Sequence, residues 1–396
     1  MDHHLLAWFR YAVILGIHTN DLDNYAIDLI ELKTTLRRLF MHKLKLLICR
    51  CFNYLLLLCV FAVYINGLYW RKRISGIMLT WLVATILFTS QALTNLLIII
   101  ETIWKEQEHE AFLLLLQRIE LTFKLRLRYA TNKRLFAAKL RRYLYYLYTI
   151  SLAGLVLFLV TTFWLQYIGY FWYGLWFIIT MRIRIIQLLV YLRVLQHYLP
   201  CLALRLSGIV AYRMTPNQQI LDVNNKRLAS LDLLLAIREI YALLFEAFQL
   251  LNEFAGWSLF SIITCYMLDI TCNIYWSLLS LDGFARRRYY YISSIWWLVP
   301  MLAMVWYVCQ LGESCKKLDR LLASLLRKIF VANSARFVCD YRLVLQQFTM
   351  QSKLQHIEVC AKNFFILDTR LVMSIFTAVA AYLVIIRQFL NAQQIN

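Results

Sequence analysis

Side chains able to do chemistry are rare in the long apolar runs of this sequence. Asp269 interrupts one run, Gln91 and Asn95 a second, and Arg387 a third. If such a run crosses a membrane, a carboxylate within it either contacts a polar or cationic ligand or hydrogen-bonds within the helix bundle. The sequence leaves both interpretations open for Asp269. Groups so few and so dispersed do not build an active site, so no enzyme is predicted.

Motifs for catalysis, phosphate binding and metal binding are absent from the sequence. It lacks GxxxxGK[ST], GxSxG and HExxH. Its seven histidines contain no pair spaced i, i+4, and its ten cysteines form no CxxC pair. We therefore expect no metal and no cofactor, and we expect the histidines at surface or interfacial positions.

Aromatic residues gather toward one end of the apolar runs. Many of them fit the aromatic belt that membrane proteins place at the membrane–water interface. Those that face the interior of a bundle would instead line a pocket for a small organic ligand. The candidate pocket residues are Trp81, Trp164, Tyr170, Tyr173, Trp176, Tyr266, Asp269 and Trp296.

The composition places these residues in a helical membrane protein. Apolar residues make up 62% of the 396 residues and charged residues 16%, against roughly half and a quarter in soluble domains. A membrane-spanning helix needs about 20 mostly apolar residues. Seven windows qualify, at residues 46–69, 77–100, 144–163, 167–180 (running on through Arg182 and Arg184), 254–279, 292–312 and 365–389. We therefore predict an all-α polytopic membrane protein with seven transmembrane helices in a single domain, residues 1–396.

The basic residues predict the orientation of the chain. A soluble chain with a net charge of +20 would suggest a nucleic-acid partner. Here the large majority of the 42 lysines and arginines lie on the side of the three long connections and the N-terminus. Positive charge marks the cytoplasmic side, so we predict a cytoplasmic N-terminus, an extracellular C-terminus and no nucleic-acid partner.

The long connections are themselves helical in pattern. In residues 230–253, acidic residues recur at intervals of seven as Asp232, Glu239, Glu246 and Glu253. They form one acidic stripe on an otherwise apolar helix. An anionic leaflet repels such a stripe, so we favour transmembrane helices that extend into a packed cytoplasmic anchor layer over helices lying on the membrane surface.

The last apolar run carries a recognisable ending. Tyr382, Gln388 and Phe389 have the spacing of the C-terminal signature of insect gustatory receptors, in which Thr-Tyr and five hydrophobic residues precede Gln-Phe. Ala381 replaces the threonine, and Arg387 replaces the fifth hydrophobic residue. With its predicted architecture, the chain resembles the insect gustatory receptor family, and the odorant receptors of similar architecture are the alternative.

The resemblance implies a ligand-gated, non-selective cation channel for soluble tastants in the cell membrane of chemosensory neurons. Leu383 follows Tyr382, where sugar receptors tend to have Glu, so a bitter or other non-sugar ligand is expected. A homo- or hetero-tetramer with related subunits is implied. A receptor that signals through G proteins is the alternative from another class, opposed by the predicted orientation and by the lack of an Asn-Pro-x-x-Tyr ending.

The same resemblance divides the chain into three parts. Residues 1–45 would form a cytoplasmic N-terminal segment, residues 46–364 the first six spans with their extensions, and residues 365–396 the pore helix and an extracellular tail. The expected pore and gate residues are Ala378, Ala381, Ile385, Gln388 and Phe389. Arg387 is expected to point away from the pore axis, because four lumenal arginines would oppose cation entry.

Overall fold

The computed structural model describes residues 36–71, 78–127, 133–165, 171–214, 230–281, 289–332 and 339–395. Residues 1–35 of the predicted N-terminal segment lie outside these ranges, and its residues 36–45 belong to a helix. The described elements are α3 (Leu36–Arg71), α4 (Met78–Trp104), α5 (Glu106–Leu125), α6 (Lys133–Trp164), α7 (Phe171–Met214), α9 (Leu231–Leu281), α10 (Tyr290–Ala332), α11 (Cys339–Leu354), β1 (Cys360–Ala361), β2 (Phe365–Ile366) and α12 (Thr369–Ile395). The predicted all-α class is confirmed, with one short antiparallel hairpin added.

Five of the described helices are long and apolar enough to cross a membrane. These stretches are Cys51–Tyr69, Leu82–Trp104, Phe136–Trp164, Gly174–Ala211 and Tyr290–Val331, and α12 holds a shorter apolar stretch, Thr369–Ile385. The predicted fifth and seventh spans lie in α9 and α12, which are not among the five. The number of spans and the side on which each terminus lies therefore stay predictions.

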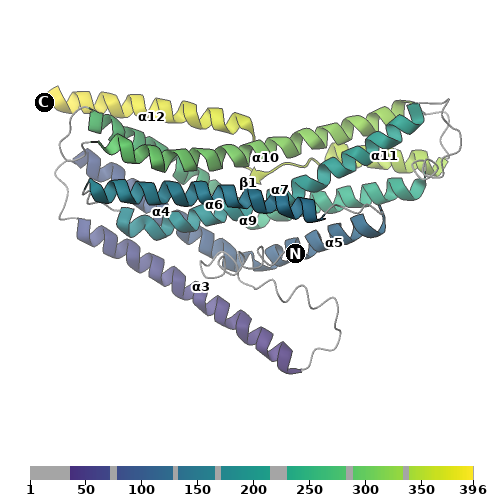
Figure 1. The fold of residues 1–396 in the computed structure, drawn as a ribbon, viewed down its shortest axis with the longest axis horizontal. Helices are drawn as coiled ribbons and strands as arrows, with labels where there is room; N and C mark the ends of the chain where they lie inside the picture. The colour runs from purple at the N-terminus through teal and green to yellow at the C-terminus, as the bar shows by residue number, and fades with distance from the viewer. Residues whose placement is uncertain are drawn as a thin grey trace.

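Three helices are far longer than a membrane is thick. α7 has 44 residues, α9 has 51 and α10 has 43. At about 1.5 Å per residue each is roughly twice as long as the ~30 Å hydrocarbon core. The predicted helical extensions are thus present, and Figure 1 shows them running side by side, with α5 and α11 packed along them.

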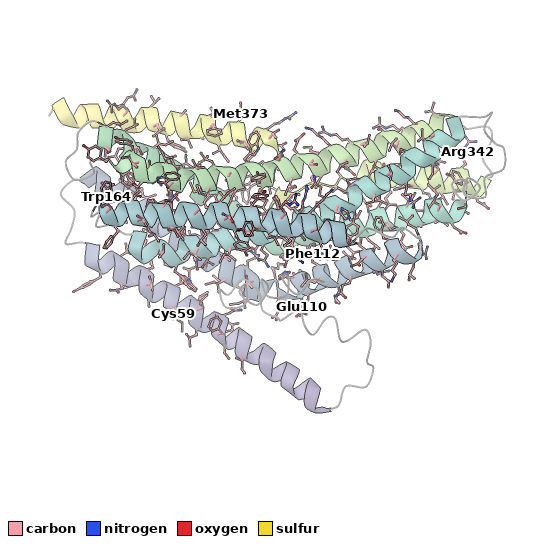
Figure 2. The ribbon with its side chains drawn as sticks, in the orientation of Figure 1. Cys59, Glu110, Phe112, Trp164, Arg342 and Met373 are labelled. Atoms are coloured by element: carbon pink, nitrogen blue, oxygen red, sulfur yellow. The ribbon has the colours of Figure 1, made fainter. Side chains whose placement is uncertain are left out.

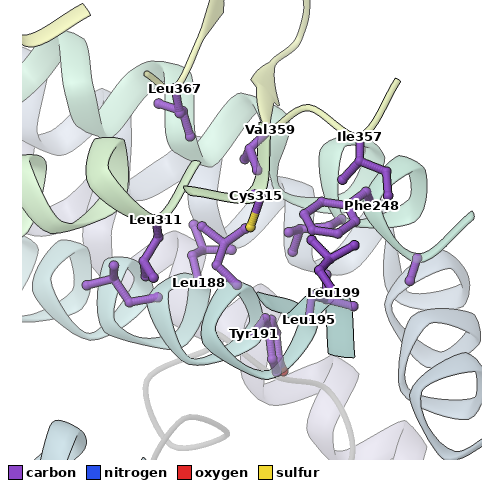
Figure 3. Packing of buried hydrophobic residues seen from close by; sticks show 14 of the residues in the cluster. Leu188, Tyr191, Leu195, Leu199, Phe248, Leu311, Cys315, Ile357, Val359 and Leu367 are labelled. Atoms are coloured by element: carbon purple, nitrogen blue, oxygen red, sulfur yellow. The ribbon is translucent and has the colours of Figure 1, made fainter. Parts of the chain in front are cut away.

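The extensions pack through one continuous apolar core. Figure 3 shows Leu188, Leu195 and Leu199 of α7 against Phe248 of α9 and Cys315 of α10. Where the alternative is exposure to water, a buried leucine contributes about 1.5–3 kcal/mol. The acidic stripe of α9 lies on the opposite, solvent-accessible face, where Glu239 pairs with Arg126 at 3.0 Å.

The last helix begins later than the sequence predicts. Residues Phe365 and Ile366 pair with Ala361 and Cys360 as a hairpin, so α12 starts at Thr369 rather than at residue 365. Asp368 caps the helix, because its Oδ1 accepts hydrogen bonds from the backbone N–H groups that follow at Arg370 (3.0 Å) and Leu371 (3.2 Å).

Candidate functional site

The helix α12 has one packed face and one open face. Val372, Ile375 and Val379 are buried against α9 and α10. The opposite face is exposed, beginning with Met373, which is labelled on α12 in Figure 2 and is 70% exposed. Because helix positions advance by about 100° per residue, the open face is a separate surface, and none of the residues that the structure describes covers it.

The predicted pore residues lie on or beside that open face. Ala381, Ile385 and Gln388 are exposed, and Ala378 is half-buried at the edge of the packed face. The motif residue Tyr382 is 49% exposed. Phe389 belongs to α12, but its side chain lies outside the described part of the chain.

A hairpin and one lysine of α10 hold the start of α12. The turn places Lys362 and Asn363 at positive φ, 46° and 62°, which permits a tight reversal. Lys316 of α10 lies 3.3 Å from Glu358 Oε1 and 3.7 Å from Asp368 Oδ2, so one ammonium joins the segment before the hairpin to the cap of α12. The position of α12 is thus tied to α10.

The thiol of Cys360 lies in the hairpin and is half-buried. This burial raises the pKa of Cys360 above its usual value, and the charge of Glu358 adds to the rise. The thiol is therefore a poor nucleophile at neutral pH.

The candidate pocket residues separate into interior, surface and undescribed groups. Tyr266 and Asp269 are buried in α9. Trp176 and Trp296 are each about two-fifths exposed, and Trp164, at the end of α6 in Figure 2, is 80% exposed. Tyr170 and the side chains of Trp81 and Tyr173 lie outside the described part of the chain.

Asp269 is held by donors from its own helix and from α10. Trp297 Nε1 donates to Oδ2 at 2.8 Å, and Asn273 Nδ2 donates to Oδ1 at 2.7 Å. Tyr290 in turn donates to Asn273 Oδ1 at 2.8 Å. Of the two interpretations of Asp269, hydrogen bonding within the bundle is therefore the one seen here. The tryptophan involved is Trp297, not its neighbour Trp296.

Two arginines that the charge count assigns to the side of the long connections are buried inside the bundle. Arg182 and Arg184 of α7 are 4% and 1% exposed. Arg182 Nη1 donates to the carbonyl oxygen of Ser151 at 2.8 Å, and its guanidinium lies 5.0 Å from the centre of the Trp297 ring. The sequence signal for this burial was the apolar run of α7, which continues on both sides of the two arginines. They therefore interrupt the run and do not mark its end.

Arg184 forms an ion pair with Glu101 of α4, at 3.7 Å. Sequence reasoning singled out neither residue. Glu101 lies in the last turn of α4, where an acidic residue at the end of an apolar run is ordinarily a solvated one, yet it is 4% exposed.

His109 is also buried, which corrects the expectation of surface histidines. It is 5% exposed, its Nε2 lies 2.8 Å from the hydroxyl of Tyr191, and its ring stacks on Phe254 at 4.6 Å. The apolar face of α5, which carries His109 and Phe112 inward, explains its burial.

A cleft of about 420 Å³ opens between α9, α10 and α12. Its walls are apolar apart from one amide and one phenol. They comprise Ile270, Leu302, Ala303, Val305, Trp306, Tyr307, Gln310, Val372, Ile375 and Phe376. None of the candidate pocket residues whose side chains the structure describes lines this cleft. Over the residues that the structure describes, no three His, Cys, Asp or Glu side chains are grouped so that they could bind a metal.

Comparison with known proteins gives one family and two curated relatives. Residues 5–390 match the sequence model of the family described as 7tm Chemosensory receptor. The chain is similar to "Putative gustatory receptor 39b" of Drosophila melanogaster, with 29% identity over 221 residues, 56% of this chain and 59% of that protein. It is also similar to "Gustatory receptor 23a" of the same organism, with 26% identity over 147 residues, 37% and 38% of the two chains. In both cases the matched region is less than two thirds of the relative's length.

The fold is similar to that of the insect olfactory receptor OR5 from Machilis hrabei. The structure of that receptor in complex with eugenol superposes with a TM-score of 0.65 at 13% identity, over 98% of this chain and 99% of that chain. A second structure of the same receptor gives a TM-score of 0.64 with the same identity and coverage. At this identity the likeness shows the fold alone.

Proposed function

The chain belongs to the 7tm chemosensory receptor family, and on that premise we propose that it is a gustatory receptor acting as a ligand-gated, non-selective cation channel for soluble, non-sugar compounds. Both curated relatives carry gustatory receptor names. The Tyr382, Gln388 and Phe389 ending supports the gustatory assignment over the odorant one.

The open face of α12 carries the proposal. Its packed residues, Val372, Ile375 and Val379, leave the opposite face to meet other copies of the chain. Small residues such as Ala381 allow helices to approach a common axis closely. Four copies of α12, from identical or related subunits, would line one central pore.

The gate in this arrangement is apolar, with an amide at its outer end. A ring of Ile385 side chains closes the path by excluding water. Gln388 and Phe389 then form the narrow end, where an amide can replace part of a cation's hydration. Arg387 lies about 100° around the helix from Gln388, so its guanidinium points to the flank of the pore helix rather than into the lumen.

The proposed ligand pocket lies deeper in the bundle than α12. Tyr266 and Asp269 are its interior members, with Trp176 and Trp296 nearer the surface. Since both oxygens of Asp269 accept hydrogen bonds from Trp297 and Asn273, this carboxylate does not offer a free site for a cation. A neutral organic ligand suits it better.

The chain is proposed to act in the cell membrane of chemosensory neurons. There the seven spans, cytoplasmic N-terminus and extracellular C-terminus would place the pocket toward the outer side, where soluble tastants arrive. The long extensions of α7, α9 and α10 would form the cytoplasmic anchor that holds four subunits together.

Whole-cell recording tests this proposal. The chain is expressed alone and with related receptor subunits, and a panel of soluble tastants is applied. We expect a ligand-evoked current that persists when G-protein signalling is blocked. Gln388→Glu should raise the relative permeability to cations, whereas Gln346→Glu, on the exposed face of α11, should not. A response that vanishes with the G-protein block would contradict the channel.

A further inference from the structure

The buried ion pair of Glu101 and Arg184 also binds the backbone of a third helix. Glu101 accepts hydrogen bonds from the backbone N–H groups of Trp257 and Ser258 in α9, both at 2.9 Å, and from the hydroxyl of Ser258. Arg184 Nη2 donates to the carbonyl oxygen of Phe254 at 3.3 Å. Glu101 and Arg184 therefore bind each other, and each also binds the main chain of α9.

The two main-chain groups bound by the pair are ones that a helix normally joins to each other. In an α-helix the N–H of residue i bonds to the carbonyl of residue i−4, which makes Ser258 N–H and Phe254 C=O partners. Here Glu101 engages the first and Arg184 engages the second. Side chains that enter the i→i−4 ladder are a recognised cause of helix bending. Residues 254–258 are thus the point at which side chains from α4 and α7 engage the main chain of α9, which stays helical there.

A ring of further contacts fixes this geometry. Arg184 Nη1 donates to Gln187 Oε1 at 2.8 Å, and Gln187 Nε2 donates to the Tyr191 hydroxyl at 3.1 Å. Tyr191 meets His109, whose ring stacks on Phe254. The side chain and the carbonyl of Phe254 are therefore both held by one connected network.

The same part of α9 carries the hairpin that leads into α12. Asn252 Nδ2 donates to the carbonyl oxygen of Glu358 at 3.0 Å, and its Oδ1 accepts from the N–H of Cys360 at 3.0 Å. Gly256 lies against Lys362 so closely that an added Cβ would sit 3.1 Å from the Lys362 backbone nitrogen. Movement of this part of α9 must therefore move the hairpin or break these contacts.

We propose that Glu101 and Arg184 are positioning residues that hold residues 254–258 of α9 in place, and through Asn252 and Gly256 the hairpin and α12. The pair joins α4 and α7 to α9 on one side of residues 252–258, and the hairpin joins α9 to α12 on the other. The inference rests on the proposed channel function only in its last step, where the position of α12 sets the pore.

Hydrogen exchange of the full chain in lipid nanodiscs tests the inference without any ligand or current. In Glu101→Gln, one N–H of α9 loses its acceptor, and we expect roughly ten-fold faster exchange at residues 254–258, the scale of one lost buried hydrogen bond. Exchange in residues 358–368 should rise with it. Glu239→Gln is the matched control, because it makes the same change on α9 in an exposed pair with Arg126, and it should alter neither segment.

A second readout follows α12 itself. Met373→Cys is introduced on the open face, and its reaction with a water-soluble thiol reagent is followed by peptide mass spectrometry, which separates it from the native cysteines. We expect Glu101→Gln to change this rate several-fold and Glu239→Gln to leave it alone. Arg184→Lys keeps the charge but loses the planar fork, so it should give an intermediate change.

Two results would overturn the inference. One is unchanged exchange at residues 254–258 in Glu101→Gln, which would show that the pair does not hold α9. The other is faster exchange there with no change in residues 358–368 or in labelling at the Met373→Cys site, which would confine the pair to local stability. If Glu101→Gln is not recovered in folded form, Arg184→Lys is judged by the same two criteria.

Discussion

Gly312 of α10 lies directly against the carbonyl oxygen of Leu367, so that a Cβ at this position would overlap the backbone that leads into α12. Glycine is required here by the close approach of two main chains, and no side chain can move aside to make room. We expect Gly312→Ala to push the start of α12 away from α10 and to cost about 1–3 kcal/mol. The measurement is the melting temperature of the purified chain in detergent.

Gly174→Ala serves as the comparison for Gly312→Ala. An added Cβ at Gly174 would lie 2.9 Å from Gln91 Oε1, the mobile end of a long side chain that can turn away. Its melting temperature should fall less. An equal fall in melting temperature in the two variants would mean that the contact between Gly312 and Leu367 is no tighter than that between Gly174 and Gln91.

The hydrogen bond from Trp297 to Asp269 gives a second prediction. Trp297→Phe keeps an aromatic side chain but removes the Nε1 donor together with one ring of the indole, so Asp269 Oδ2 loses its bond in the interior. Leaving a buried acceptor in this state costs about 1–3 kcal/mol, and the melting temperature should fall. Trp296→Phe changes a residue that is 41% exposed, so its melting temperature should stay close to that of the wild type. A larger fall in Trp296→Phe than in Trp297→Phe would mean that Trp296, not Trp297, is the interior tryptophan.

These two tryptophans also show where sequence reasoning succeeds and where it stops. The apolar runs predicted the helices, and the acidic stripe of residues 230–253 predicted that helices extend beyond those runs. Adjacent residues on a helix point about 100° apart, so the choice between Trp296 and Trp297 depends on where α6, α7 and α9 lie. Nothing in the local sequence records that arrangement.

The sequence did not predict that Arg182 and Arg184 are buried, for a related reason. A charge count treats each arginine as solvated, which holds unless a partner is supplied from elsewhere in the chain. Arg184 finds Glu101, from a helix more than 80 positions earlier, together with the carbonyl oxygen of Phe254. Pairings of this kind become visible only when the helices are packed.

Lys316 gives a third prediction, at the junction between α10 and α12. Lys316→Met removes the charge that lies between Glu358 and Asp368, leaving the two carboxylates to repel each other. These ion pairs of Lys316 are partly buried, so we expect the free energy of unfolding to fall by an amount on the order of 1 kcal/mol. Hydrogen exchange should rise in residues 358–371.

Lys317→Met is the matched control for Lys316→Met. Lys317 is exposed and pairs only within its own helix, with Glu313 at 3.6 Å. Exchange in residues 358–371 should stay at the wild-type rate in this variant. A rise as large as that in Lys316→Met would remove the case for a specific tie between α10 and α12.

The sharpest prediction about permeation concerns Arg387 and its neighbour Gln388. If the Ala381, Ile385 and Gln388 face lines the pore, Arg387 points to the flank, and four arginine charges do not act on the passing ion. Arg387→Met should therefore leave the reversal potential under a sodium gradient where it was, while Gln388→Glu should shift it toward the cation equilibrium potential. Were Arg387→Met to raise cation selectivity instead, the guanidinium would belong in the lumen, and the pore face of α12 would have to be rotated by about one residue.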